Sequence, residues 1–364
     1  MPGKFILWTT LAATVLTVVL RYTGVNPVVV FGASCLAILG LASILGHATE
    51  ALGAHAGPRI GGILNATVGN VGEIIISIFA LRAGLVDLVK ASITGSILGN
   101  LLLVFGASLI VGGARHGIQR FDPRTAGMNA VQLVLATIGL IVPATFALLV
   151  GGEQLAENFW PIENVTIGVA ILLLILYGLS VVYDLTRPLG ETVRSGDEAA
   201  VHVGHAHAPG GWRVPLLALT VSAGLLAWIS EILVGSVEPV VHTLGISEFF
   251  LGVILIPVVG NLAEHMVAVQ LAMKNKMDFS VAVSLGSATQ IALFAAPVLV
   301  FLSIPLGHPL TLVFAPFEVV AIAGGSMIAA LIAIDGESNW LEGAQLVAVY
   351  LMLAVAFFFL PVPH

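Results

Sequence analysis

The chain has 364 residues, of which 58% are hydrophobic and only 9% are charged, and its mean hydropathy is +1.07. A soluble domain of this length exposes far more charge, so the composition excludes a water-soluble protein. The formal net charge of −7 argues against a nucleic-acid partner, and the single cysteine, Cys35, excludes an internal disulfide. We therefore expect an all-α, multi-pass integral membrane protein.

Apolar runs between charged residues or Gly/Pro breaks predict about eleven transmembrane helices of roughly 20 residues each. The predicted spans run approximately over 4–21, 27–55, 58–83, 87–113, 124–150, 162–186, 213–237, 246–273, 278–304, 309–334 and 340–361. The first resembles a secretory signal, but it lacks a clear cleavage site and is followed by Arg21 and another span. We interpret it as a helix of the protein.

The chain is expected to consist of two related halves. We predict an extra N-terminal helix over 1–25, a five-helix repeat over 26–186, a linker over 187–211 and a second five-helix repeat over 212–364. An offset of 191 residues carries Glu73 onto Glu264, Asp87 onto Asp278, and Gly95-Ser96 onto Gly286-Ser287. Because five is odd, the second repeat should enter the membrane inverted relative to the first, as in many secondary transporters.

Basic residues are distributed unequally between the two predicted sides. One side carries Lys4, Arg59, Arg115, Arg120, Arg124, Arg187, Arg194, Arg213, Lys274 and Lys276, whereas the other carries Arg21, Arg82 and Lys90. The positive-inside rule then places the N-terminus and the linker in the cytoplasm. The linker histidines, His202, His205 and His207, fit a solvated loop better than a metal sensor.

The strongest functional signal is a phrase that occurs twice inside apolar spans. It reads Gly69-Asn70-Val71-Gly72-Glu73 in the first half and Gly260-Asn261-Leu262-Ala263-Glu264 in the second. An acid there costs about 2.5–3.5 kcal/mol on insertion scales, which makes function the default reading. Each Asn lies three residues before its Glu and shares its helix face. Two unrelated acids held in helix packing are the alternative, and the fixed offset argues against it.

These oxygen atoms favour a hard divalent cation. Ca²⁺ takes roughly 6–8 oxygen ligands. Two carboxylates and two amides supply several, and Pro257 should free a backbone carbonyl near residue 253. No cysteine accompanies the phrases, which disfavours a soft metal.

Adjoining spans add polar groups at related positions. They are Ser92, Thr94, Ser96 and Asn100 in the first half, and Ser284, Ser287, Thr289 and Gln290 in the second. Ser96, Asn100, Ser287 and Gln290 are candidate ligands that complete the site. The same small and polar residues also hold transmembrane helices together, so packing stays open as an alternative for each.

Further intramembrane titratable groups surround this core. Glu50, with His47 one turn before it, pairs with Glu231 of the second half, and both acids are candidates for gating or proton relay. Snorkelling at a helix end is the alternative. His265 follows Glu264 and either tunes proton coupling or packs. Glu318 has no evident counterpart, and its role is left open.

The carboxylates alone suggest an exchange mechanism. Two carboxylates close together in a low dielectric cannot easily both stay ionised without a cation. Ca²⁺ would displace their protons, and protons would remove the ligands of Ca²⁺. The two ions therefore compete for one site, and an empty, doubly charged site is penalised.

The residues resemble the Ca²⁺/H⁺ antiporters of the cation/Ca²⁺ exchanger superfamily. The resemblance is carried by both Gly-Asn-x-x-Glu phrases, Gly95-Ser96 with Asn100, Gly286-Ser287 with Gln290, and the stretch 335–343 before the last span. Related Na⁺/Ca²⁺ exchangers usually carry Ser/Thr and Pro ahead of the acid. Asn with Val-Gly or Leu-Ala stands here, which is similar to the proton-coupled branch.

The resemblance implies a transporter rather than an enzyme, with no cofactor and with Ca²⁺ as transported substrate. Glu73 and Glu264 would bind the cation near the midplane, Asn70 and Asn261 would complete the site, and the helix pair of Glu50 and Glu231 would gate it. The short linker points to a prokaryotic cell membrane, and a homo-oligomer is compatible with the sequence.

Three alternatives remain at this point: Na⁺ or Mn²⁺ as the main substrate, a passive cation channel, and an intramembrane zinc protease. The last would need a His-Glu-x-x-His type motif, whereas Asn261 stands where the first His belongs.

Overall fold

The computed structural model of the chain describes residues 4–57, 61, 64, 67–150, 159–186 and 211–360. In this part of the chain nearly all regular structure is helical. Two short strands, β1 (Gln119–Arg120) and β2 (Glu337–Ser338), pair antiparallel and join a loop of the first half to one of the second. The expected all-α membrane class is confirmed.

The first half contains helices of very unequal length. They are α1 (Lys4–Tyr22), α2 (Pro27–Ala56), α4 (Val71–Arg82), α5 (Val86–Leu98), η1 (Gly99–Val104), α6 (Phe105–His116), α7 (Pro123–Val150) and α8 (Phe159–Thr186). The segment η1 is a π-helical turn that joins α5 to α6, so that Val86–His116 forms one span. Of the predicted span 58–83, only isolated positions before residue 67 are described.

The second half repeats this pattern. It contains α11 (Arg213–Gly235), α12 (Val237–Leu244), α13 (Glu248–Phe250), η2 (Leu251–Leu255), α14 (Ile256–Met273), α15 (Met277–Gln290), η3 (Ile291–Ala295), α16 (Ala296–Ser303), α17 (Pro316–Asp335) and α18 (Trp340–Phe359). The segments η2 and η3 are again π-helical, and π-turns inside helices are frequent at functional sites.

The prediction of a helix from residue 309 is wrong at its start, because α17 begins only at Pro316. Leu310, Leu312 and Phe314 are buried while the residues between them are less so, which is the period of two of an extended segment. Proline at 309 and 316 delays the helix, because proline fits a helix only in its first turn.

Nine described helices are long and apolar enough to cross a membrane, and a tenth span is a pair, Glu248–Leu262 and Glu264–Met273, bent by 66°. The short helix α4, with 12 residues, lies below that length. Together with α4, these spans occupy the eleven positions predicted from hydropathy.

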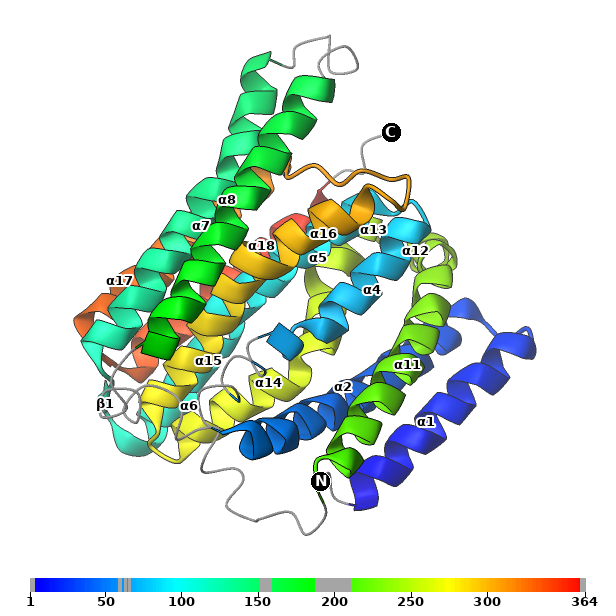
Figure 1. Cartoon of the computed structure of the whole chain (residues 1–364), viewed down its shortest axis with the longest axis horizontal. Helices are drawn as coiled ribbons and strands as arrows, with labels where there is room; N and C mark the ends of the chain where they lie inside the picture. Colours follow the sequence, from blue (N-terminus) through cyan, green and yellow to red (C-terminus); the bar gives the residue numbers. More distant parts are fainter. Residues whose placement is uncertain are drawn as a thin grey trace.

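The packing of the two halves is reciprocal. Helix α2 packs on α14, and α11 packs on α4; α7 packs on α15, and α17 packs on α5; α8 packs on α16, and α18 packs on α6. Exchanging each helix for its partner in the other half turns each of these six contacts into another of the six. This is the relationship that an inverted repeat requires. In Figure 1, α1, α2 and α11 lie on one side of the molecule and α7, α8 and α17 on the other, with α5, α14 and α15 between them.

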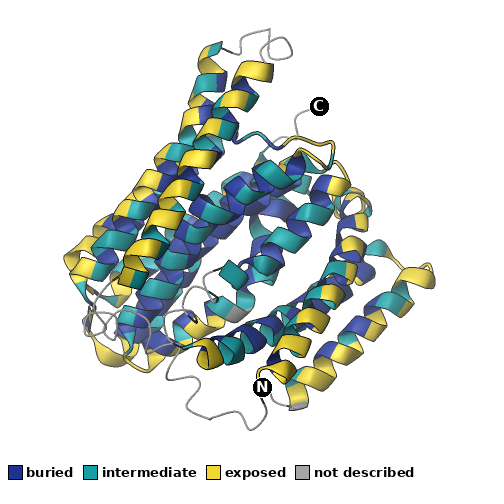
Figure 2. Cartoon of the chain, in the orientation of Figure 1, coloured by how far each residue is buried: buried dark blue, intermediate teal, exposed yellow. Residues whose placement is uncertain are grey.

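Burial follows this arrangement. Figure 2 shows dark blue, buried residues along the central helices and yellow, exposed ones on the outer sides of α1, α7 and α8. The exposed side chains of these outer helices are themselves apolar, for example Leu16, Leu135 and Leu172. Large apolar surfaces of this kind are stable when lipid covers them.

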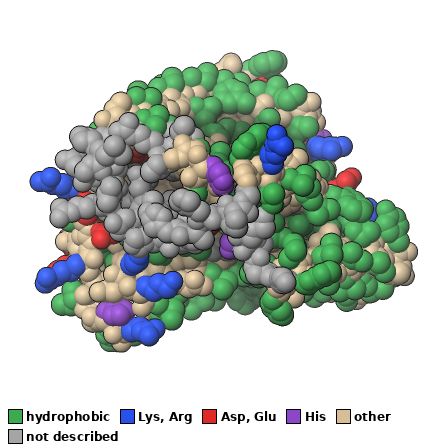
Figure 3. All heavy atoms as spheres, turned by 60° about the horizontal axis from the view of Figure 1, so that its bottom comes forward, with side chains coloured by type: hydrophobic (Ala, Val, Ile, Leu, Met, Phe, Trp, Pro, Cys, Tyr) green, Lys and Arg blue, Asp and Glu red, His purple; other side chains and the backbone are tan. Residues whose placement is uncertain are grey.

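The helix ends define two opposite faces. We call the one at which α1 begins the N-terminal face; α2, α6 and α14 end there, and α7, α11 and α15 begin there. The described basic residues at that face are Lys4, Arg115, Arg120, Arg124, Arg213, Lys274 and Lys276, and Arg21, Arg82 and Lys90 lie at the far face. Figure 3 shows blue side chains gathered beside the N-terminal face and green, apolar flanks. Arg59, Arg187, Arg194 and the linker histidines lie outside the described residues.

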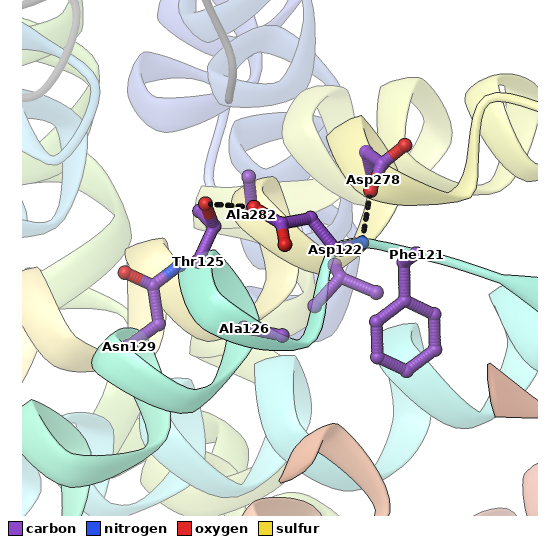
Figure 4. A pocket seen from close by; sticks show the side chains of 8 residues that line it. Phe121, Asp122, Thr125, Ala126, Asn129, Asp278 and Ala282 are labelled. Carbon is purple, nitrogen blue, oxygen red and sulfur yellow. Dashed lines mark hydrogen bonds between the residues drawn. The ribbon is translucent and has the colours of Figure 1, made fainter. Parts of the chain in front are cut away.

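The N-terminal face is held together by bonds between the halves. The backbone N–H of Asp122, directly before α7, donates to the Asp278 carboxylate on α15 at 2.6 Å (Figure 4). The Asp122 carboxylate in turn accepts from the Thr125 hydroxyl at 2.8 Å and from the backbone N–H of Arg124 at 3.2 Å. The first turn of α7 is thereby capped and fixed against α15.

Candidate functional site

Glu73 lies in the first turn of α4, because the Gly-Asn phrase interrupts the predicted span. Gly69 and Asn70 form a turn, and Asn70 is the residue before the helix begins at Val71. A helix N-terminus carries partial positive charge, which favours an ionised carboxylate there. The Glu73 side chain is only 7% exposed, and neither of its oxygens accepts a hydrogen bond from the described part of the chain.

Glu264 occupies the corresponding place in α14. The 66° bend of this span lies between Leu262 and Glu264, so Glu264 begins its second segment. One Glu264 oxygen accepts a hydrogen bond from the Ser287 hydroxyl on α15 at 2.9 Å. A broken helix at the site is the device by which transporters expose helix ends to an ion inside the membrane.

The two asparagines cross between the halves. Asn70 donates through Nδ2 to Gln290 Oε1 at 2.9 Å, and Asn261 donates through Nδ2 to Ser96 Oγ at 3.2 Å. Both asparagines are 1% exposed. Each phrase is therefore anchored on the polar helix of the opposite half.

The two glutamates approach each other across this crossing. A Cβ placed on Gly260 would lie 3.5 Å from Glu73 Cγ, so the Glu73 side chain lies directly beside the second phrase. Glu264 is near enough to act electrostatically on Glu73. Like charges in a dry interior repel strongly, so this pair is stable when a cation or protons neutralise it.

Several polar atoms here remain without a partner among the described residues. They are both Glu73 carboxylate oxygens, Asn70 Oδ1 and Asn100 Nδ2. A buried polar atom without a hydrogen bond costs about 1–3 kcal/mol. Asn100 Nδ2 is a donor, but the two Glu73 oxygens and Asn70 Oδ1 are acceptors, and these three indicate a ligand that supplies positive charge. No three His, Cys, Asp or Glu side chains come together in the part of the chain that is described. The unpartnered carboxylate and amide oxygens at Glu73 and Asn70 are of the kind that hard cations prefer.

The carbonyl expected near residue 253 has another role. Pro257 follows the π-helical segment η2, but Val253 O lies against Gly95 on α5, and the Pro257 ring contacts the same glycine. A side chain at Gly95 would overlap that carbonyl. Val253 O and Pro257 therefore lie at a close crossing of α5 over η2, and the role of this carbonyl as a ligand stays a prediction.

The predicted gating acids lie in opposite halves of the membrane. Glu50 is partly buried near the end of α2 at the N-terminal face, and Glu231 is exposed near the end of α11 at the far face. The helices α2 and α11 contact each other extensively. His47 bonds its own helix through Ser43 O at 2.7 Å. His265 is 7% exposed, and its Nε2 has no partner among the residues described.

Glu318 has a partner that the sequence did not reveal. Its carboxylate accepts from the Thr94 hydroxyl on α5 at 2.6 Å and from the backbone N–H of Ala315 at 2.8 Å. The side chain is 2% exposed. Glu318 thus caps α17 and fastens it to the back of the helix that carries Ser96. No local spacing signals a pair separated by 224 residues.

Comparison with known proteins assigns the chain to a family. The sequence pattern described as sodium/calcium exchanger protein matches residues 26–186 and 214–359. The Ca²⁺/H⁺ antiporter of Aphanothece halophytica is 41% identical over 349 residues, covering 93% of this chain and 92% of that protein. The Ca²⁺/H⁺ antiporter ChaA of Bacillus subtilis is 41% identical over 333 residues, covering 91% and 92%.

Solved structures with a similar fold support the same assignment. Native YfkE superposes with a TM-score of 0.82 at 38% identity, covering 98% of this chain and all of that one. The H⁺/Ca²⁺ exchanger CAX superposes with a TM-score of 0.75 at 16% identity, which supports the fold alone. The chain belongs to the sodium/calcium exchanger protein family.

Proposed function

We propose that this chain is a secondary active transporter that exchanges Ca²⁺ for H⁺ across a membrane. The observation that carries the proposal is the pair of Glu73, which is buried, and Glu264, which is partly buried; they lie close together between the two halves, near amide and hydroxyl groups. The antiporters of Aphanothece halophytica and Bacillus subtilis, which align over nearly the whole chain, support the same ion pair. Such a site performs transport rather than covalent chemistry.

In this proposal Ca²⁺ and protons compete for the same oxygens. When both glutamates are ionised, their charge and the unpartnered Asn70 Oδ1 attract the divalent ion. When both are protonated, the charge is neutralised and the ligands are lost. Either loaded state can cross the hydrophobic barrier, whereas the empty, charged site is penalised, and this penalty couples the two fluxes.

We further propose alternating access, with α2 and α11 as the moving pair. These two helices contact each other and carry Glu50 and Glu231 at opposite ends. Sliding of the pair past the remaining helices would open one end of the site while it closes the other. Residues 26–186 and 212–364 would then be the two inverted repeats of one transporter.

The excess of basic residues at the N-terminal face supports a cytoplasmic N-terminus. A prokaryotic cell membrane is the proposed location, in agreement with the short linker between the halves. The oligomeric state stays a prediction from the sequence.

Purified protein in proteoliposomes tests the proposal. An imposed pH gradient should drive ⁴⁵Ca²⁺ against its own gradient, and the same vesicles should be compared with Mn²⁺ and Na⁺. Faster transport of Mn²⁺ or Na⁺ would reassign the substrate. Ca²⁺ flux that never accumulates against its gradient would favour a passive channel.

A further inference from the structure

A polar seam runs from Glu264 to the N-terminal face, on the opposite side of α14 from α2. On α15 it consists of Ser280, Ser284 and Ser287, which are spaced at i, i+4 and i+7 counted from the N-terminal face and are all at most 7% exposed. Ser287 bonds Glu264, so this face of α15 looks toward α14.

The facing surface of α14 has only small side chains. Ala268 and Ala272 follow Glu264 at i+4 and i+8, and both are fully buried. The third wall is α6, on which Ser108 and Gly112 share a face. A Cβ placed on Gly112 would lie 2.5 Å from Gln119 Oε1 and 3.4 Å from the Ala272 Cβ. The Gln119 amide therefore closes the end of the seam between α6 and α14.

Three polar atoms in the seam are fully buried and unpartnered among the residues described. They are Ser280 Oγ, Ser108 Oγ and Gln119 Oε1. Buried polar atoms in proteins are normally hydrogen-bonded, either to protein or to ordered water. At its outer end the seam continues to the surface, since Gln119 Nε2 donates to Asn275 Oδ1 at 3.4 Å and Asn275 lies between Lys274 and Lys276.

Helix packing does not require these hydroxyls. The equivalent positions in the other half of the chain show this. The offset of 191 residues relates Ser280 to Val89, Ser284 to Ile93 and Ser108 to Leu299. These three apolar residues are at most 4% exposed and pack the corresponding interface. At these three positions the interface near the far face is apolar, whereas the interface near the N-terminal face carries hydroxyls, and those of Ser280 and Ser108 have no partner among the described residues.

We propose that this seam, lined by Ser287, Ser284, Ser280, Ser108 and Gln119, is a water-bridged proton path between the ion site and the N-terminal face. Each hydroxyl or water accepts one proton and passes another on, so a proton moves between bulk water and the Glu264 carboxylate without a net change in the chain. The inference rests on the proposed Ca²⁺/H⁺ exchange.

Two transport measurements distinguish the contribution of the proton path from that of the ion site. Uptake driven by a pH gradient needs proton movement, whereas exchange of ⁴⁵Ca²⁺ for unlabelled Ca²⁺ needs only the ion site and the gate. The decisive quantity is the ratio of the two rates, measured in proteoliposomes. The double variant Ser108→Val/Ser280→Val should lower this ratio about tenfold, since a relay group typically accelerates proton transfer by at least that factor.

The matched control is Ser108→Thr/Ser280→Thr, which has nearly the same shape as the valine variant but keeps both hydroxyls. Its ratio should stay at the wild-type value. Gln119→Met is a second, independent test, because it changes no residue of α6, α14 or α15. It should also lower the ratio of the two rates. An unchanged ratio in the valine and methionine variants, or an equal fall in the threonine variant, would overturn the proton path. A wild-type protein without pH-driven uptake would instead overturn the proposed function.

Discussion

Asn70 donates a hydrogen bond to Gln290 at 2.9 Å, although the two residues are 220 positions apart in the chain. The bond joins the start of α4 in the first half to the end of α15 in the second. It uses the amide nitrogen of Asn70, and the amide oxygen Oδ1 has no partner in the described part of the chain. In the proposed exchange, this bond would let Gln290 orient the Asn70 oxygen toward the cation.

Replacing Gln290 by Ala should weaken cation binding. Asn70 would lose its anchor and leave a buried N–H unsatisfied, which costs about 1–3 kcal/mol. We expect the half-saturating Ca²⁺ concentration to rise about tenfold, since each 1.4 kcal/mol is a factor of ten. Gln270→Ala, an exposed position on α14, is the control. Equal Ca²⁺ dependence in the two variants would show that the bond does not position Asn70.

The pair Gly95 and Gly286 provides a matched test of the helix crossing. A Cβ at Gly95 would overlap the Val253 carbonyl, whereas a Cβ at Gly286 meets no other atom within 4 Å. Gly95→Ala should therefore destabilise the protein by about 1–3 kcal/mol or more through overpacking. Gly286→Ala should be neutral or slightly stabilising. Thermal unfolding of both variants in detergent measures the difference, and equal Tm values would contradict the crossing.

The bond between Thr94 and Glu318 should contribute to stability. Thr94→Val keeps the shape of the side chain but removes the donor to a buried carboxylate, at an expected cost of about 1.5–3 kcal/mol. A lower Tm than wild type is predicted. Thr220→Val serves as control, because the exposed Thr220 hydroxyl bonds only its own helix at Leu216 O. If Thr220→Val lowered Tm as much as Thr94→Val, the bond between Thr94 and Glu318 would not contribute specifically to stability.

Asp122 makes the stability of the N-terminal face depend on pH. Partial burial opposes ionisation, but hydrogen bonds from Thr125 and Arg124 outweigh it and lower the pKa of Asp122 below its ordinary value. The stabilisation is therefore present above the pKa of the unfolded chain, about 3.9, and is lost as pH falls through the folded pKa.

The change Asp122→Ala removes the cap and should cost about 0.5–2 kcal/mol at pH 7. The difference in Tm between variant and wild type should shrink as pH falls below about 4. A difference that stayed constant down to pH 3 would show that the charge of Asp122 does not matter.

The sequence predicted the broad plan because its signals are strong. Hydropathy located the spans, and the common offset of Glu73 and Glu264 predicted two related halves. It misplaced the start of the span at 309, because the segment from Leu310 to Phe314 is as apolar as a helix but extended and buried on alternate residues. Hydropathy counts apolar residues and does not detect their period.

Specific partners were beyond the sequence. Four polar residues near each phrase were candidates, yet only the crossing of the helices decides that Asn70 bonds Gln290 and that Asn261 bonds Ser96. Thr94 was expected near the site, but it points to Glu318 on the opposite side of α5. The contact of the Val253 carbonyl with Gly95 was not expected either. These outcomes depend on helix rotation, which residue types alone do not fix.

The most direct test of the account is ⁴⁵Ca²⁺ uptake driven by a pH gradient in proteoliposomes that contain Glu73→Gln or Glu264→Gln. Each change removes one ionisable ligand of the shared site, and we expect uptake to fall about a hundredfold, which corresponds to about 2.7 kcal/mol. Glu337→Gln, an exposed acid on β2, should transport like wild type. Folded and inserted Glu73→Gln and Glu264→Gln variants that exchange at the wild-type rate would contradict the assignment of the site.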